Sequence, residues 1–157
     1  MGMQGSGKST IGELLAQRIG VPFIDGDSLH SVANKQWMAS GHALSDAQRL
    51  PWLHKIGERL ALSDGSGVVV ACSALKRSYR DLLREHAPTM LTIFTRGPID
   101  LIQARIAARR HEYMPISLLQ TQLGDLEERQ ADEPGLTVDI AKAPESIVER
   151  IMKGISE

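Results

Sequence analysis

The sequence predicts an α/β fold in which a parallel β-sheet carries helices on both faces. The chain has 157 residues, of which 42% are hydrophobic and 24% charged, and this composition fits one globular domain spanning residues 1–157. Short apolar runs alternate along it with amphipathic segments, which is the pattern of strand–helix–strand units. A glycine-rich motif also opens the chain directly before the first amphipathic segment.

Four short apolar runs are expected to form strands. They are rich in Val and Ile and are bounded by Gly, Asp or Pro, as buried parallel strands usually are. The expected strands cover residues 21–25, 67–72, 91–95 and 136–140.

Three amphipathic segments are expected to form helices, over residues 8–19, 98–109 and 144–155. Gly20 can end the first helix in a left-handed conformation. Pro98 and Pro144 stand where the other two begin, and proline is favoured in a first helical turn. Residues 28–63 read as mostly helical with a break near Gly41, and we expect them to form an inserted substrate-binding segment.

The motif at residues 2–9 matches the phosphate-binding pattern GxxxxGK[ST] in full. Glycines allow the backbone to wrap a phosphate closely, the lysine places its charge on the β- and γ-phosphates, and the final hydroxyl coordinates Mg²⁺. A flexible glycine-rich terminus ahead of an unrelated helix is the alternative. The expected nucleotide-binding residues here are Gly2, Met3, Gln4, Gly5, Ser6, Gly7, Lys8, Ser9 and Thr10.

A phosphate loop normally follows a buried strand, yet only Met1 precedes this one. We therefore expect the first, central strand of the sheet to be missing from these 157 residues and to lie upstream of Met1. Without that strand its two neighbours would have unpaired edges. A fold that dispenses with the strand is the alternative.

Two carboxylates, Asp25 and Asp27, follow the first expected strand and lie two residues apart. Such a strand end faces the ligand crevice of an α/β sheet, where a carboxylate can accept a hydroxyl proton or hold magnesium. The run at 68–73 ends without an aspartate, so magnesium needs a carboxylate from elsewhere, and Asp139 competes for that role. Alternatively, Asp25 only caps the next helix.

Basic residues recur at three places beyond the phosphate loop. A phosphoryl-transfer site needs several positive groups around the γ-phosphate, whereas the alternative is that each of these residues lies on a solvated helix face. Arg105 and Arg109 precede a short stretch ending in Pro115, and we expect a mobile lid over residues 105–118. The basic residues concerned are Arg49, then Lys76, Arg80 and Arg84 on one helical face, then Arg105 and Arg109.

Charge and cysteine content exclude several classes of protein. Eighteen basic and nineteen acidic residues give a net charge of −1, so no nucleic-acid partner is expected. Cys72 is the single cysteine, which rules out an internal disulfide and a thiolate zinc site. No apolar run is long enough to cross a membrane, and no signal peptide is recognisable, so we expect a cytoplasmic protein.

Taken together, the motifs resemble those of the gluconate kinases, the small thermoresistant-type gluconokinases. The resemblance runs through the whole chain in the family's order, and its most specific parts are Pro-Trp-Leu at 51–53 and Cys-Ser-Ala-Leu-Lys-Arg at 72–77. One departure lies in the lid, where Glu112 occupies the place of the family's usual histidine. The other matching parts are the stretches 2–9, 25–30, 38–41, 79–84 and 113–115, the single residues Leu44, Asp46, Arg49, Arg105, Arg109, Leu118, Leu119 and Gln122, and the pair at 126–127.

The resemblance implies a P-loop kinase of the nucleoside-monophosphate-kinase type that transfers phosphate from ATP to the 6-hydroxyl of D-gluconate, with Mg²⁺ as cofactor and a homodimer as a possible assembly. There are two alternatives: a kinase that acts on another small polar acceptor, such as shikimate or a related sugar acid, and a nucleotide-binding module without catalytic activity. The residue roles implied are catalysis by Lys8, Asp27 and Arg109; metal binding by Ser9 and Asp25; gluconate binding by Asp27, His30, Arg49, Lys76 and Arg80; and phosphate binding from the lid by Arg105 and Arg109.

Overall fold

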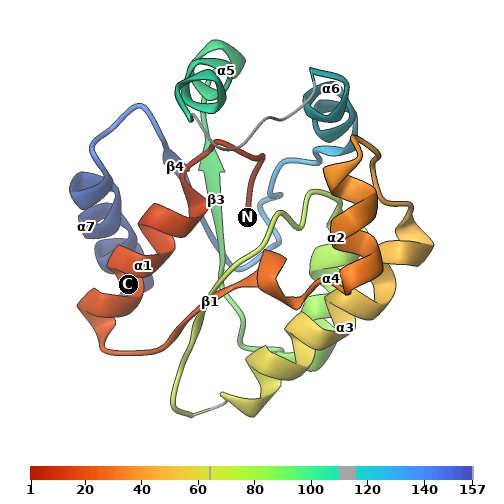
Figure 1. Ribbon diagram of the computed structural model, residues 1–157. Coiled ribbons are helices and arrows are strands. Elements are labelled where there is room, and N and C mark those ends of the chain that lie inside the picture. Colours follow the sequence, from red (N-terminus) through yellow and green to blue (C-terminus); the bar gives the residue numbers. More distant parts are fainter. Residues whose placement is uncertain (64, 110–115, 157) are drawn as a thin grey trace.

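A computed structural model describes residues 1–63, 65–109 and 116–156 (Figure 1). Helices and strands alternate as the sequence predicts. In chain order the elements are α1 (Lys8–Ile19), β1 (Phe23–Asp25), the 3₁₀ helix η1 (Gly26–Leu29), α2 (Val32–Ala39), α3 (Asp46–Leu62), β2 (Val69–Ala71), α4 (Arg77–His86), β3 (Thr92–Arg96), α5 (Ile99–Ala108), α6 (Ile116–Asp125), β4 (Gly135–Asp139) and α7 (Pro144–Ile155).

The strands form two parallel pairs, β1 with β2 and β3 with β4. All four expected strands are present, each shifted or shortened by one or two residues at its ends. Met1 and Gly2 connect the two pairs: the Met1 nitrogen donates to the Ile93 carbonyl at 2.6 Å, and the Gly2 nitrogen donates to the Ser73 carbonyl at 3.1 Å. In the described part of the chain, these two residues alone take the central position of the sheet.

Helices pack on both sides of the strands, and each side has its own apolar core (Figure 1). On one side α1 and α7 bury Ile11, Leu15 and Ile151 together with Val138 of β4. On the other side α3 and α4 bury Trp52, Leu53, Ile56 and Leu83 against Cys72, which follows β2.

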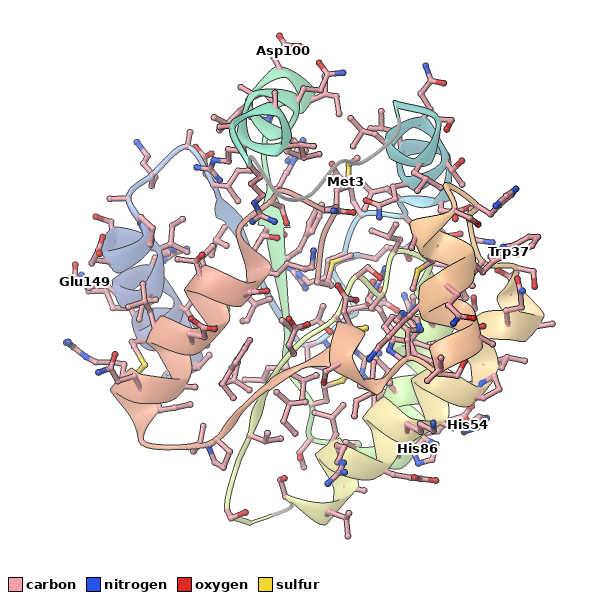
Figure 2. All side chains as sticks on the ribbon, in the orientation of Figure 1. Met3, Trp37, His54, His86, Asp100 and Glu149 are labelled. Atoms are coloured by element: carbon pink, nitrogen blue, oxygen red, sulfur yellow. The ribbon has the colours of Figure 1, made fainter. Side chains whose placement is uncertain are left out.

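A third core cluster lies beneath α5 and α6, around Met3 of the phosphate loop (Figure 2). Ile102 of α5, Leu119 of α6 and Ile140 after β4 pack against Met3. The apolar side chain in the middle of the loop therefore anchors it to the helices on either side of residues 110–115, which lie outside the described residues.

Local signals account for most helix ends. Gly20 adopts a φ of 74° and its N–H donates to the Ala16 carbonyl at 2.9 Å, as expected for the end of α1. Gly41, with a φ of 90°, lies in the expected break between α2 and α3. Pro144 is the first residue of α7, whereas Pro98 immediately precedes α5, because its extended backbone makes it the N-cap.

The turn after β2 contains Ala74, whose φ of 41° is the one positive value among the described non-glycine residues. An L side chain is strained in this region, so surrounding contacts must hold the turn. Arg80 supplies them by donating to the carbonyls of Ala74 and Leu75 at 3.1 and 3.0 Å. The turn leads into α4 and positions Lys76 and Tyr79.

Candidate active site

The phosphate loop runs from Gly2 to the start of α1 and needs glycine at two points in particular. Gly5 and Gly7 have φ values of 81° and 82°, and a Cβ on Gly5 would lie 2.8 Å from Ile106 Cγ1. The Ser6 hydroxyl is buried against Thr95 Oγ1 at 2.7 Å. The loop is therefore a fixed, tightly packed turn at the N-terminus of α1, where backbone N–H groups and the helix dipole favour an anion.

A polar pocket of about 150 Å³ lies at this loop. It brings together residues that the sequence singled out in three separate places: the phosphate loop, the end of β1 and the end of α5. The lining residues are Gln4, Gly5, Gly7, Lys8, Ser9, Asp25, Asp27, Ala71 and Arg109.

Lys8 lies inside this pocket, where its Nζ donates to the Met3 carbonyl at 2.9 Å. Burial lowers the pKa of Lys8 below its ordinary value, while the carboxylates of Asp27 and Asp25 partly oppose that shift. A phosphate in the pocket would provide further negative charge and would favour the charged amine. The arrangement is suited to hold a polyanion.

Asp25 and Asp27 both reach the pocket, and Asp25 also caps η1. The Asp27 N–H donates to Asp25 Oδ1 at 3.0 Å. Asp25 therefore caps η1 and lines the pocket at the same time. Gly26 between them is held closely, because a Cβ there would lie 2.6 Å from the Ala71 carbonyl oxygen. Trp52 Nε1 donates to the Gly26 carbonyl at 2.7 Å and fixes the turn from the side of α3.

The donor set of this pocket fits Mg²⁺ bound together with phosphate. Mg²⁺ prefers oxygen ligands and usually takes only one or two from the protein, the rest coming from phosphates and water. Ser9, Asp25 and Asp27 supply a hydroxyl and two carboxylates. Residues 1–63, 65–109 and 116–156 contain no cluster of three or more His, Cys, Asp or Glu side chains arranged for a metal.

A second group of charged residues, here called the Arg49–Lys76 cluster, comprises Asp46, Arg49, Lys76, Tyr79 and Asp125. Lys76 Nζ lies 3.0 Å from Asp46 and 3.7 Å from Asp125, and Arg49 Nη1 lies 3.2 Å from Asp125. Both cations also lie over the Tyr79 ring, at 5.7 Å for Arg49 and 5.6 Å for Lys76. The Tyr79 hydroxyl donates to Asp46, and this bond, followed by that from Lys76, lowers the pKa of Asp46.

His30 lies beside this cluster and stacks on Trp52 with the ring centroids 4.1 Å apart. Burial, followed by the charges of Arg49 and Lys35, lowers the pKa of His30 from 6.5 to about 4. The imidazole is therefore neutral near pH 7. Its Nδ1 is buried and has no hydrogen-bond partner among the described residues, which leaves it available to a polar ligand.

Arg80 corrects one expectation from the sequence. Its side chain is 1% exposed and forms a two-point ion pair with Glu133, at 2.6 and 2.8 Å. Because the remaining guanidinium N–H groups hold the Ala74 turn, Arg80 has no group to offer a substrate. Lys76, which was expected on the same helical face, is instead the N-cap of α4, and its half-buried side chain remains at the site.

Other predicted residues divide between the pocket and its surroundings. Arg109 lines the phosphate pocket, but Arg105 donates to the Ile140 carbonyl at 2.8 Å, beyond β4. Thr10 is exposed on α1 and does not line the pocket. Asp139, the competitor for the metal, instead accepts the Ala141 N–H at 2.9 Å. Part of the expected lid, residues 110–115 with Glu112, lies outside the described residues.

Sequence reasoning did not assign roles to four residues that shape the site. Asp46 and Tyr79 fall inside the motifs that carry the family resemblance, so their position could have drawn attention. Asp125 and Glu133 have no such signal, because their partners Arg49 and Arg80 lie far away in the sequence. The separations are 76 and 53 positions, respectively. Only the fold brings these carboxylates to Arg49 and Arg80.

The shikimate kinase family model matches residues 4–153. The chain belongs to the shikimate kinase family. Relatives that share well over 30% of its residues are gluconokinases. A gluconokinase from Arabidopsis thaliana is 38% identical over 99% of this chain and 90% of its own length. The thermoresistant gluconokinase of Escherichia coli K12 is 40% identical over 94% of this chain and 86% of its own. The resemblance to gluconokinases inferred from the motifs is thus confirmed.

Solved structures agree with this placement. The kinase superposes on a gluconokinase from Sinorhizobium meliloti 1021 with a TM-score of 0.91 and 46% identity, covering 99% of this chain and 89% of the other. The shikimate kinase of Aquifex aeolicus vf5 gives a TM-score of 0.60 at 21% identity, which shows a shared fold alone. The expected P-loop kinase fold is confirmed.

Proposed function

We propose that this kinase transfers the γ-phosphoryl group of ATP to the 6-hydroxyl of D-gluconate. The observation that carries the proposal is one pocket lined by Lys8, Ser9, Asp27 and Arg109, in a chain whose relatives are gluconokinases. In the reaction the acceptor oxygen forms a bond to the γ-phosphorus, the bond to the bridging oxygen of ADP breaks, and the hydroxyl proton leaves.

Each pocket residue has a role in this transfer that its position supports. Lys8 and the loop amides bind the phosphates, and Arg109 adds positive charge from the end of α5. Asp27 orients the acceptor hydroxyl and accepts its proton. Ser9 and Asp25 would hold Mg²⁺, which, when bound, neutralises charge on the β- and γ-phosphates.

The sugar acid is proposed to bind at the Arg49–Lys76 cluster. A carboxylate with a row of hydroxyls suits a guanidinium and an ammonium held side by side, and here Asp46 and Asp125 orient the two cations. His30 Nδ1 is proposed to bind one of the hydroxyl groups. Arg80 has no direct part.

Two finer proposals are a cytoplasmic location, which was expected from the sequence pattern, and a homodimer, which the resemblance to gluconate kinases implies. Sedimentation analysis would test the homodimer. Among the helices of the described residues, none combines the length and the apolar character needed to cross a bilayer. A net charge of −1 lacks the basic excess that is typical of nucleic-acid binders, so no nucleic-acid partner is proposed.

The decisive experiment measures ADP release with ATP, Mg²⁺ and either D-gluconate or shikimate, for the wild type, Asp27→Asn and, as a control, Asp100→Asn on the surface of α5. Gluconate is expected to be strongly preferred. Asp27→Asn should lower kcat by roughly 10²–10⁴-fold, because general-base catalysis contributes that much, with ATP affinity changed only a fewfold. Equal turnover of shikimate would overturn the substrate, and unchanged kcat in Asp27→Asn would overturn the assignment of the base.

A further inference from the structure

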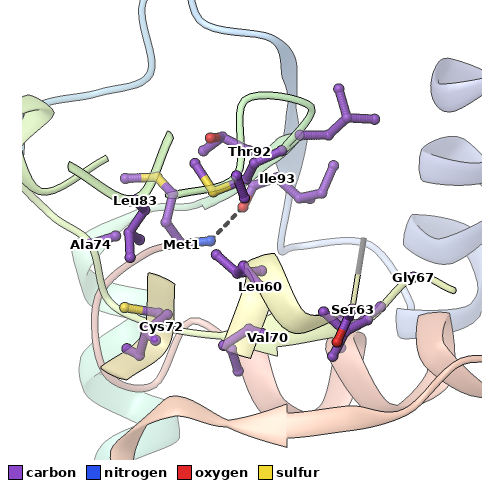
Figure 3. Close-up of a pocket in the computed structure, with 18 of the residues that line it drawn as sticks. Met1, Leu60, Ser63, Gly67, Val70, Cys72, Ala74, Leu83, Thr92 and Ile93 are labelled. Atoms are coloured by element: carbon purple, nitrogen blue, oxygen red, sulfur yellow. Dashed lines mark hydrogen bonds between the residues drawn. The ribbon is translucent and has the colours of Figure 1, made fainter. Parts of the chain in front are cut away.

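The charges of the Arg49–Lys76 cluster balance one another before any ligand binds. Its two cations face two carboxylates, Asp46 and Asp125, so the formal charge of the cluster is zero. The residues of the cluster line neither the phosphate pocket nor the apolar cavity of about 790 Å³ that lies between the strand pairs (Figure 3). The charge is thus balanced locally, and a sugar acid would bring a third carboxylate to two cations.

Asp125 is placed as the carboxylate of a ligand would be. Its Oδ2 lies 3.2 Å from Arg49 Nη1, and its Oδ1 lies 3.7 Å from Lys76 Nζ. One carboxylate therefore spans both cations, which is how a bound sugar acid would use the same two donors. Asp125 and the acceptor compete for one position.

Of the two carboxylates in the cluster, Asp46 has the more extensive contacts. Its oxygens accept from Lys76 Nζ at 3.0 and 3.2 Å, and the Tyr79 hydroxyl donates to it as well. It also lies in the first turn of α3, where the helix dipole stabilises a negative charge. The bonds from Tyr79 and Lys76 lower the pKa of Asp46, so it stays ionised and paired.

Asp125 has fewer contacts and a less favourable place. Among the described residues it accepts one hydrogen bond, from Arg49, and its contact with Lys76 is a longer ion pair. It is the last residue of α6, where the helix dipole disfavours a negative charge. The turn around it is open: Leu123 is 43% exposed, and a Cβ on Gly124 would meet no described atom within 4 Å apart from its neighbours in the helix. The Asp125 side chain can therefore turn away without disturbing a core.

Contacts on either side of Asp125 hold the rest of α6 independently of the cluster. Gln122 Oε1 accepts the Gln4 N–H of the phosphate loop at 2.8 Å. Beyond the helix, the Glu127 N–H donates to the Leu75 carbonyl at 2.9 Å. Release of Asp125 from the two cations thus needs only a local change and leaves the helix attached to the phosphate loop.

We propose that Asp125 is a built-in competitor of the acceptor and makes a carboxylate a requirement for tight binding. In the empty site it holds Arg49 and Lys76; when gluconate binds, the carboxylate of the acceptor takes its place and Asp125 turns towards solvent. This exchange leaves the charge between the two cations unchanged. A neutral polyol cannot replace Asp125 in the same way, because a hydroxyl group binds a cation more weakly than a carboxylate does. The inference rests on the proposed function and adds a residue that sets the specificity for the acceptor.

The test measures the Kd of D-gluconate by calorimetry and its KM in the kinase assay for the wild type, Asp125→Asn, Asp125→Ala and Glu128→Gln. Both Asp125 variants should lower the Kd and the KM about fivefold, because they lose one partly exposed ion pair that competes with the acceptor. The kcat should change by less than about twofold, since the exchange affects ground state and transition state alike. Glu128, which pairs with Arg96 at 3.1 Å, is the matched control and should leave the Kd unchanged.

D-Glucitol, in which a hydroxymethyl group replaces the carboxylate of gluconate, separates the effect of charge from that of shape. It should bind weakly to the wild type and gain less from Asp125→Asn than gluconate does. A crystal structure with bound gluconate should show Asp125 beyond the roughly 4 Å of an ion pair from both Arg49 and Lys76.

Gluconate binding that is weaker or unchanged in both Asp125 variants would overturn the proposal, and so would an equal gain in Glu128→Gln or with glucitol. A complex in which Asp125 still spans Arg49 and Lys76 would contradict it as well. A wild type without gluconate turnover would overturn the proposed function together with this inference. Turnover by the wild type with an unchanged Kd in both Asp125 variants would overturn this inference alone.

Discussion

At the scale of single residues, Arg80 and Glu133 show how a buried charge can serve a site that it does not touch. The pair is enclosed, at 1% and 0% side-chain exposure, and the same guanidinium holds the carbonyls of the strained Ala74 turn. Burial alone would raise the pKa of Glu133, but its bonds to Arg80 reverse the shift and hold that pKa below its ordinary value. The pair therefore positions Lys76 through the turn.

Removing one member of this pair should cost much more stability than removing both. Glu133→Leu or Arg80→Met leaves a buried charge without its partner and is expected to lower the free energy of unfolding by roughly 3–5 kcal/mol. The double variant Arg80→Met with Glu133→Leu should recover a large part of the loss. Urea unfolding of the four proteins measures this, and losses that simply add in the double variant would contradict the coupling.

His30 makes the stability of the fold depend on pH. Its pKa is about 4 in the folded protein, below the ordinary value of 6.5 that applies to the unfolded chain. As the pH falls, the unfolded chain therefore binds a proton at His30 before the folded protein does. The contribution of His30 is therefore fully present above about pH 6.5 and is lost progressively down to about pH 4. His30→Phe keeps the stacking on Trp52 without the titration.

As the pH is lowered from 7.5 to 4.5, the Tm measured by thermal unfolding should consequently fall less steeply for His30→Phe than for the wild type. The exposed ring of His42 provides the control, since His42→Phe should follow the wild-type slope. Parallel slopes for all three proteins would show that His30 does not titrate as its burial implies.

At the scale of elements, α3 begins at a complete capping box. Ser45 Oγ accepts the Gln48 N–H at 3.2 Å, and Gln48 Oε1 accepts the Ser45 N–H at 2.8 Å. This cap fixes the start of the helix that carries Arg49, and Asp46 lies in the same first turn. The inserted segment at 28–63 was predicted as helical from its pattern, and the cap explains where its second helix starts.

Ser45→Ala should lower the free energy of unfolding by about 1 kcal/mol, because two helix-terminal N–H groups lose their partners. Chemical denaturation checks the value. Ser66→Ala, in the turn after α3, is a matched control and should change the stability much less. A loss in Ser45→Ala no larger than in that control would argue that water satisfies the helix end equally well.

At the scale of the whole molecule, nucleotide binding should stabilise the fold through the phosphate loop. A ligand that binds the native state alone at 100 times its Kd adds about 2.7 kcal/mol to the free energy of unfolding. Lys8→Met is expected to abolish most of this gain with ADP while leaving the unliganded Tm nearly unchanged, since desolvation of the half-buried ammonium already opposes its charge, as its lowered pKa shows.

Differential scanning fluorimetry with and without ADP and Mg²⁺ measures that gain. Lys142→Met, in the exposed loop between β4 and α7, controls for the loss of one positive charge. A Lys8→Met protein that gains as much Tm as the wild type would remove Lys8 from the phosphate site.

Patterns within a few residues of each other sufficed to predict the phosphate loop, the four strands, α1 and α7, because glycine freedom, apolar periodicity and caps act over one or two turns of chain. The same patterns could not show that Arg80 is a buried structural residue while Lys76 and Arg49 lie at the site. Whether a cation is buried depends on a carboxylate such as Glu133 or Asp125, brought to it from another part of the chain. The tertiary structure alone decides this, because desolvation and pairing are set by distance in space.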